Sequence, residues 1–194
     1  MPPPRRSQQD RSQATRSQLV AVGRTLFAER GYAHVSADEI VAAAGLTRGA
    51  LYHHYGGKEE LFAAVFENLE AELTAEVVAA LGAEPDRSAA LRLGLGTFLD
   101  LCSRPDVVRI ALTDAPAVLG WERWRAIEAA QGLGVLVDAL RAAGVERDVP
   151  TLARLVLSAV IEAALLIAHH PQPEQARAEA ERALTALLAG LLPG

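Results

Sequence analysis

Two helix-start patterns lie close together between Ser36 and Lys58, with a glycine between them. Ser36 can cap the free amides of a first helical turn, and Glu39 can reach back to the Ser36 amide, which is the capping-box pattern. Thr47 is a second candidate N-cap. Gly45, just before it, can adopt the left-handed conformation that commonly ends a helix. The stretch therefore predicts two short helices joined by a tight turn, the helix-turn-helix arrangement.

The second of these helices offers little to a hydrophobic core. Leu51 is its one large aliphatic residue, and the other positions are small, aromatic or basic. Small residues at its N-terminal end let the backbone approach a partner, and free helix amides suit phosphate. Arg48 can read guanine and Ala50 can contact a thymine methyl, while Tyr52 and His54 can reach the DNA backbone. This helix is predicted to recognise DNA.

The stretch LTRGALYHHYGGKEELFAAV, preceded by SADEIVAAAG and by a helix ending LFAERGYAHV, closely resembles the DNA-binding domain of the tetracycline-repressor (TetR) family. The resemblance covers roughly residues 13–66 and implies a dimeric, ligand-responsive, sequence-specific repressor. Two positions depart from the family pattern. Gly57 stands where a better N-capping residue is common, and Tyr55 stands where Phe is more usual.

The resemblance also implies roles on DNA. Arg48, Gly49 and Ala50 match base-reading positions, whereas Ser36 and the more C-terminal polar residues match phosphate-contacting ones. The full set of candidate DNA-binding residues is Ser36, Thr47, Arg48, Gly49, Ala50, Tyr52, His53, His54 and Lys58.

Charge is divided unevenly along the chain. Residues 1–58 hold eight Arg and Lys against four Asp and Glu, and residues 59–194 hold eleven against twenty, within a net charge of −5. A basic N-terminal part on an acidic body is expected when only that part meets phosphate. Residues 1–12, with Arg5, Arg6 and Arg11, are predicted to be a disordered basic arm that either contacts DNA or is a solvated tail.

The single cysteine and the N-terminal residues indicate the cellular setting. Cys102 alone cannot form an intrachain disulfide, which favours a reducing compartment, and on an apolar helix we interpret it as a small core residue rather than a redox sensor. The N-terminus has no apolar run typical of a signal peptide. We therefore expect a cytoplasmic protein.

Apolar residues recur at helical spacing along the whole chain, without the alternation of a strand, so we predict an all-α fold of about nine helices. A helix-turn-helix domain over 13–57 should precede a helical ligand-binding and dimerisation domain over 58–194. A kink is expected at DAPAVLGW, residues 114–121. Apart from the two short helices, the expected helices are 14–30, 58–81, 88–103, 105–113, 121–143, 150–169 and 173–191.

The helix at 150–169 is apolar nearly all round, with Arg154 and Glu162 as its only charges. Its length would suit a membrane span, but the two charges and the lack of a second hydrophobic segment favour a soluble helix. A helix that is apolar on all sides must be buried on all sides. We predict that helices 150–169 and 173–191 pair with their copies in a homodimer, with no membrane partner.

Two tryptophans, three residues apart after the kink, predict either the wall of a ligand pocket or a cover over the core or the dimer edge. A body rich in Leu, Val and Ala suits an apolar or aromatic small molecule. The candidate ligand contacts are Phe98, Leu101, Ile110, Thr113, Trp121 and Trp124.

No pattern in the chain predicts catalysis, a cofactor or a metal site. Asp114, Glu122 and Glu128 lack a nearby nucleophile with its base or a phosphate-binding loop. His169 and His170 point in different directions on a helix and are better suited to its C-terminal end.

We therefore predict a homodimeric regulator whose recognition helices enter successive major grooves of a palindromic operator, about 34–36 Å apart. A small, largely apolar effector should release it. The alternatives are a small-molecule carrier that keeps the helix-turn-helix without regulating through DNA, and an all-helical enzyme whose site the sequence does not display.

Overall fold

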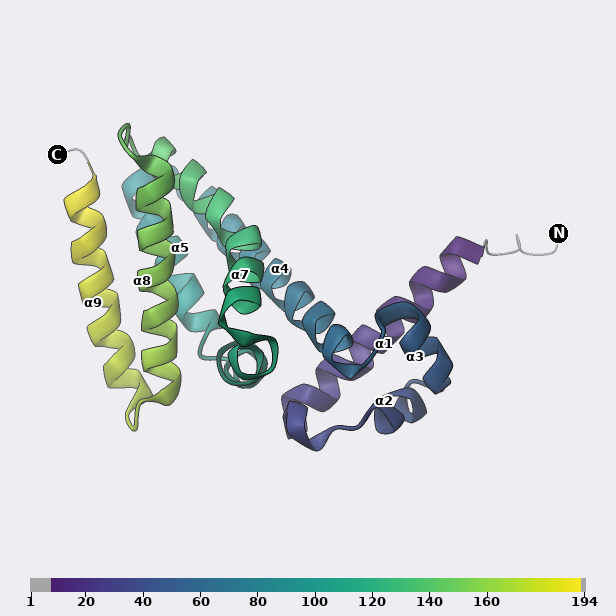
Figure 1. Cartoon of the computed structure of the whole chain (residues 1–194). Helices are drawn as coiled ribbons and strands as arrows, with labels where there is room; N and C mark the ends of the chain where they lie inside the picture. Colours follow the sequence, from purple (N-terminus) through teal and green to yellow (C-terminus); the bar gives the residue numbers. More distant parts are fainter. Residues whose placement is uncertain (1–7, 193–194) are drawn as a thin grey trace. The chain divides into compact units, whose positions relative to one another are not determined.

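The computed structural model describes residues 8–192, and within this range the chain is helical without strands (Figure 1). This agrees with the predicted all-α class. The chain divides into two compact units, one up to Glu67 and one from Asn68 onward. We describe each unit separately, as the N-terminal head and the C-terminal body.

The head contains α1 (Gln8–Arg30), η1 (Tyr32–His34), α2 (Ala37–Ala43), α3 (Arg48–Tyr55) and the first turns of α4 (Lys58–Ala83). Its core is formed by fully buried side chains from α1, α2, α3 and α4, and the Phe27 and Phe62 rings meet edge to face at 5.2 Å. Because α4 contributes part of this core, the head extends about ten residues beyond the domain end that we predicted at residue 57. The buried set is Leu19, Phe27, Ile40, Leu51, Leu61, Phe62, Val65 and Phe66.

The two predicted helix starts are confirmed in the head. The Ser36 hydroxyl accepts a hydrogen bond from the Glu39 amide, and the Glu39 carboxylate accepts one from the Ser36 amide. Thr47 accepts a hydrogen bond from the Ala50 amide at the start of α3. Gly45 has φ +63°, and the following amide of Leu46 donates to Val41 across the end of α2. This left-handed residue produces the tight turn between α2 and α3.

Helix α1 begins at Gln8, six residues before the predicted start. Residues 8–12 are therefore helical rather than part of the disordered arm that we predicted. Asp10 lies in the first turn, where the positive N-terminal end of the helix dipole stabilises a negative charge. Arg11 is an exposed residue of this helix, whereas Arg5 and Arg6 lie outside the described residues.

The body contains the rest of α4, then α5 (Arg87–Leu101), α6 (Pro105–Val107), the π-helical η2 (Val108–Asp114), α7 (Ala115–Ala142), α8 (Val149–His169) and α9 (Pro173–Leu191). Helix α8 packs against both α7 and α9, and α5 packs against all three (Figure 1). The central α8 is long and apolar enough to cross a membrane by length and composition alone. Its inner face is instead buried in the body core, with residues such as Ala153, Val160 and Ile167.

The predicted kink lies at Gly120, which has φ +76° and interrupts α7. An L-residue rarely adopts this conformation, so a glycine is the natural break point. The preceding residues continue from α6 through η2 without leaving the helical conformation. The segment 105–119 is thus one irregular helix, longer than the 105–113 helix that we predicted.

Candidate DNA-binding surface and body cavity

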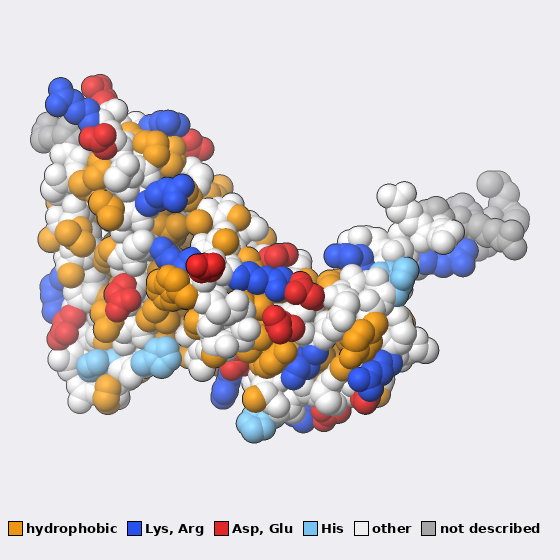
Figure 2. Space-filling model, in the orientation of Figure 1, with side chains coloured by type: hydrophobic (Ala, Val, Ile, Leu, Met, Phe, Trp, Pro, Cys, Tyr) orange, Lys and Arg blue, Asp and Glu red, His pale blue; other side chains and the backbone are white. Residues whose placement is uncertain are grey.

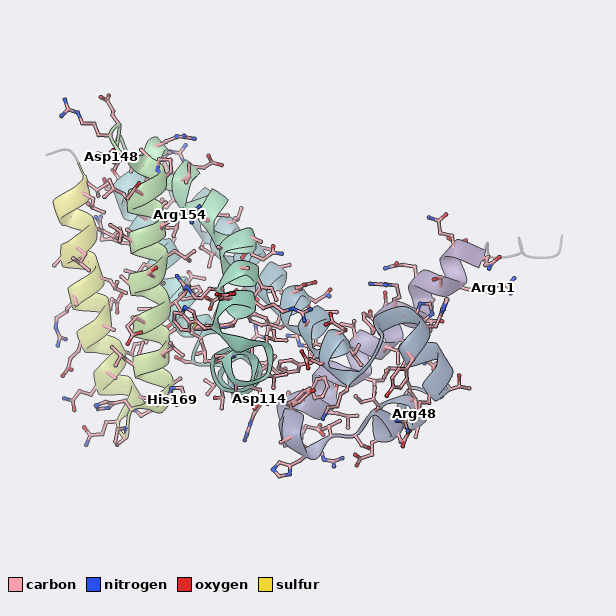
Figure 3. The ribbon with its side chains drawn as sticks, viewed as in Figure 1. Arg11, Arg48, Asp114, Asp148, Arg154 and His169 are labelled. Carbon is pink, nitrogen blue, oxygen red and sulfur yellow. The ribbon has the colours of Figure 1, made fainter. Side chains whose placement is uncertain are left out.

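Helix α3 is fixed in the head by one side chain and exposes the rest. Leu51 is fully buried, while Arg48, Gly49, Tyr52 and His53 are exposed. Because consecutive residues of a helix point in different directions, one anchor facing inward leaves the other faces for a partner. Figure 3 shows Arg48 at the surface of the head.

Arg48 is held in place by two neighbours. Its guanidinium forms a salt bridge with Asp38 at 3.3 Å, donates to the Tyr52 hydroxyl at 3.4 Å, and lies 5.5 Å from the centre of the Tyr52 ring. The hydrogen bond to Tyr52 and the Asp38 charge both raise the pKa of Arg48. The side chain is therefore an exposed positive charge that two contacts hold at the start of α3.

The C-terminal end of α3 is tied to α1. Arg16 donates to the His54 carbonyl at 3.2 Å and stacks on the Tyr55 ring, whose hydroxyl donates back to the Arg16 carbonyl at 3.1 Å. A cation at this position is stabilised by the negative C-terminal end of the helix dipole. The hydroxyl gives a structural role to Tyr55, one of the two departures from the family pattern, because Phe could not make this bond.

Lys58 lies at the start of α4 and is half-buried. Its ammonium group donates to the carbonyls of Tyr32 and Val35, at 3.0 Å and 2.9 Å, and lies 3.8 Å from the centre of the Tyr32 ring. Two of its three protons thus fix the segment just before the N-cap Ser36. Desolvation lowers the pKa of Lys58. The residue has a clear structural role in addition to the phosphate contact that we predicted.

The body encloses a cavity of about 100 Å³, lined mainly by apolar side chains of α4, α5, α7 and α8. Four polar side chains reach its wall: Glu70 and Thr74 from α4, Cys102 after α5, and Glu128 from α7. The wall thus combines a large apolar surface with few polar groups, which is typical of small-molecule sites.

The two carboxyl groups of the cavity are strongly perturbed. Burial raises the pKa of Glu70 to about 8, and the nearby Glu128 charge adds to this shift. Burial also raises the pKa of Glu128 to about 7, although Arg125 opposes the change through a 3.1 Å salt bridge. Burial and the same carboxylates raise the pKa of the Cys102 thiol. The thiol is therefore kept in its neutral form.

Two family profiles match the chain. The profile of bacterial regulatory proteins of the tetR family matches residues 19–65, and that of the tetracyclin repressor-like C-terminal domain matches residues 88–191, more than half of the chain. The chain belongs to the TetR family. Members of the TetR family are DNA-binding transcription regulators, usually repressors, and the family is not known for enzymes.

Solved and curated TetR-family proteins give the same assignment. A TetR-family regulator from Pectobacterium atrosepticum is 35% identical, with a TM-score of 0.83 over 97% of this chain and 99% of that one. The regulator CymR of Pseudomonas putida is 39% identical over 74 residues, 38% of this chain and 36% of CymR. The TetC protein of transposon Tn10 from Escherichia coli is 43% identical over 60 residues, 31% of this chain and 30% of TetC. The matched segment spans about a third of these two curated relatives.

The structure brings the predicted DNA-binding residues of this TetR-family chain together in the head. They are the N-cap of α2, the N-cap and residues of α3, and the first position of α4, and most are exposed. Their contacts with DNA stay predictions. The more buried members of the set are Ala50, His54 and Lys58.

The predicted ligand contacts are dispersed. Phe98 lines the cavity, whereas the other five are not part of its wall. Ile110 and Trp124 are fully buried elsewhere, and Trp121 is 64% exposed. Leu101 is also buried, and Thr113 is exposed. The five therefore stay predictions that the cavity does not support.

Sequence reasoning missed Glu70 and did not place Glu128 in a pocket. Glu70 lies within the apolar stripe of α4, between Leu69 and Leu73, and Glu128 lies one turn after Trp124. A carboxyl group within an otherwise apolar helix face is the pattern that could have identified both.

Proposed function

We propose that this chain is a homodimeric transcription repressor that binds a palindromic operator through α3 and is released by a small ligand in the body cavity. The observation that carries the proposal is the exposed face of α3 with Arg48 fixed at its N-terminal end, in a TetR-family head. In this arrangement Arg48 reads bases, and phosphate contacts supply most of the affinity.

Helix α4 provides a route from ligand to DNA. Its first residue, Lys58, supports the segment that leads into α2, and the same helix carries Glu70, Thr74 and Val77 into the cavity wall. The dimer would have two states, which differ in the position of α4 and in the spacing of the two recognition helices. A ligand shifts the dimer toward one state only if it binds that state more tightly than the other. The operator is then released when that spacing no longer fits successive grooves.

The proposal is tested by selecting genomic fragments with the purified chain at near-physiological salt and sequencing those that stay bound. We expect a palindrome with half-sites about one helical turn apart. Recovery of random DNA alone would contradict the operator and favour a small-molecule carrier that does not act through DNA.

Arg48→Ala should relax the choice of operator sequence. Loss of a side chain that reads a base costs about 1–3 kcal/mol at the cognate base pair, while binding to random DNA changes little. The measurement is a titration of the operator and of single-base variants at fixed salt. Arg48→Lys is the matched control, because it keeps the charge and loses the bidentate geometry. An equal loss on operator and random DNA would refute the base-reading role.

Lys58→Ala should weaken binding to operator and random DNA alike. It should also reduce the slope of log binding constant against log salt concentration by about one. Because two backbone carbonyls lose their hydrogen-bond donor, the free energy of unfolding should also fall by roughly 1–3 kcal/mol. Salt-dependent titrations and urea unfolding separate the two effects, with Lys58→Met as the control that keeps the aliphatic packing. A stability loss without any change of salt slope would leave Lys58 with a structural role alone.

A further inference from the structure

The two carboxyl groups of the body cavity differ in their hydrogen-bond and ion-pair partners. Glu128 is paired with Arg125, which also donates to the Ser158 hydroxyl at 2.8 Å and so joins α7 to α8. The Glu70 carboxyl makes neither a hydrogen bond nor a salt bridge with any group in residues 8–192. Polar groups removed from water are normally hydrogen-bonded, and a charged one is normally paired. Glu70 is half-buried and is the cavity carboxyl group without such a partner in the described residues.

The surroundings of Glu70 favour a positive partner. The titratable groups near it are Glu128 and the Cys102 thiol, which stays neutral because its pKa is raised, and Arg125 is already engaged by Glu128. The remaining wall is mainly aliphatic, with Leu73, Val77 and Phe98 among its members. The cavity therefore offers one unpaired acceptor, a second carboxylate nearby, and apolar surface for the rest of a ligand.

We propose that the cavity binds a small organic cation, an ammonium group with an apolar tail, whose positive head pairs with the Glu70 carboxylate. An ammonium group supplies the missing donors to Glu70 and also relieves its repulsion with Glu128. A neutral alcohol supplies one hydrogen bond and no charge, and an anion would add a negative charge beside two carboxyl groups in an apolar wall. The regulatory part of this inference rests on the proposed repressor function, whereas the binding itself does not.

The size of the cavity indicates the scale of a first probe. A protein cavity of about 150 Å³ is known to hold benzene, so about 100 Å³ accommodates a chain of roughly five non-hydrogen atoms. Butylamine and 1-butanol share a butyl tail and carry a positive and a neutral head at pH 7, and butyrate is a short-chain anion of similar size. The first two therefore isolate the charge of the head, and butyrate tests a negative one.

Calorimetric titration of the full chain with these three probes tests the proposal. Butylamine should bind about 10- to 100-fold more tightly than 1-butanol, and butyrate should bind most weakly. In Glu70→Gln the preference for butylamine over 1-butanol should fall to within about threefold. Because Glu70 loses its proton when it pairs with the ammonium group, the heat of butylamine binding should depend more strongly on the ionisation enthalpy of the buffer in the parent chain than in Glu70→Gln, where only Glu128 can release a proton.

Two further variants control the result. Glu67→Gln, on the exposed side of α4 three residues earlier, removes the same charge outside the cavity and should keep the preference. Glu128→Gln should reduce it less than Glu70→Gln, since Glu128 is already paired. The proposal is overturned by 1-butanol binding as tightly as butylamine, by an unchanged preference in Glu70→Gln, or by no binding of any probe.

Release of a selected operator fragment is measured separately with the same probes. Butylamine that binds with the Glu70 dependence and leaves the DNA complex intact would confirm the cation site and contradict the ligand-released repressor. If 1-butanol or butyrate releases the DNA and calorimetry shows no preference for butylamine, the ligand-released repressor would be supported and the cation site contradicted.

Discussion

Leu166→Glu should convert the proposed dimer into a monomer and lower its affinity for the operator by at least about 100-fold. Leu166 and Leu155 are 58% and 63% exposed on α8. They lie eleven residues apart, which is close to three full turns, so both are on the same face. Apolar side chains gathered over α8 and α9 are visible in Figure 2. A glutamate in an apolar interface would remain charged and unpaired.

Helix α9 offers a complementary surface. Leu187 is 58% exposed, and the small residues Ala183, Ala186 and Gly190 lie beside it at helical spacing and are also exposed. Small side chains let two helices approach closely, and exposed leucines on adjacent helices form the kind of apolar patch that marks an interaction surface. These faces support the predicted four-helix interface of α8 and α9 with their copies.

The large loss of operator affinity is expected because a dimer binds both half-sites of the operator at once. A monomer presents one recognition helix, whereas a dimer binds the second half-site as an intramolecular event, which typically strengthens binding by 10²–10⁴-fold. Light scattering at micromolar concentration and an operator titration measure the two consequences. Leu93→Glu is the matched control, because Leu93 is an exposed leucine on α5. A dimer that persists in Leu166→Glu would refute this interface.

The sequence predicted the head in detail because its determinants are local. The capping box at Ser36, the Thr47 cap and the left-handed Gly45 each act within a few residues of the chain. Even so, the contacts of Lys58 with Tyr32 and Val35 were not predictable, since they join segments 23 and 26 residues apart. Local patterns specify a helix boundary, but a side chain's partners depend on tertiary packing.

The body shows where pattern reading fails. Large aromatic side chains are rare in this chain, so Trp121 and Trp124 predict either a pocket wall or a cover over the core or the dimer edge, and neither lines the cavity. After the break at Gly120, Trp124 is fully buried and Trp121 is exposed to solvent. Glu70 and Glu128 come from helices far apart in the sequence, and only the fold of the body places both at one cavity.

The free energy of unfolding should fall as the pH rises from about 5 to 8. Glu70 and Glu128 have pKa values of about 8 and 7 in the folded chain, above the ordinary value of 4.5. The folded state therefore binds more protons than the unfolded state across this range, and stability decreases with pH by up to about 1.4 kcal/mol per unit for each carboxyl group. Below pH 4.5 both states are protonated, and this contribution to the pH dependence ends.

Other groups do not reproduce this profile. Hydrogen bonds from Ser36 lower the pKa of Glu39 to about 2, so its contribution is constant above pH 4.5 and is lost only as the pH falls toward 2. Desolvation lowers the pKa of His54, which makes its contribution to stability increase with pH near 6.5, the opposite sign. A fall between pH 5 and 8 is thus specific to the raised carboxyl groups.

Urea unfolding at fixed protein concentration, at each pH unit from 5 to 8, measures the effect. Glu70→Gln should be more stable than the parent chain at pH 8, and its profile should flatten above pH 7, where Glu128 alone has already titrated. Glu67→Gln should keep the parent slope, because Glu67 is exposed on the same helix. A parent profile that is flat or rises with pH would contradict a desolvated Glu70, and would remove the reason for a cation at this position in the cavity.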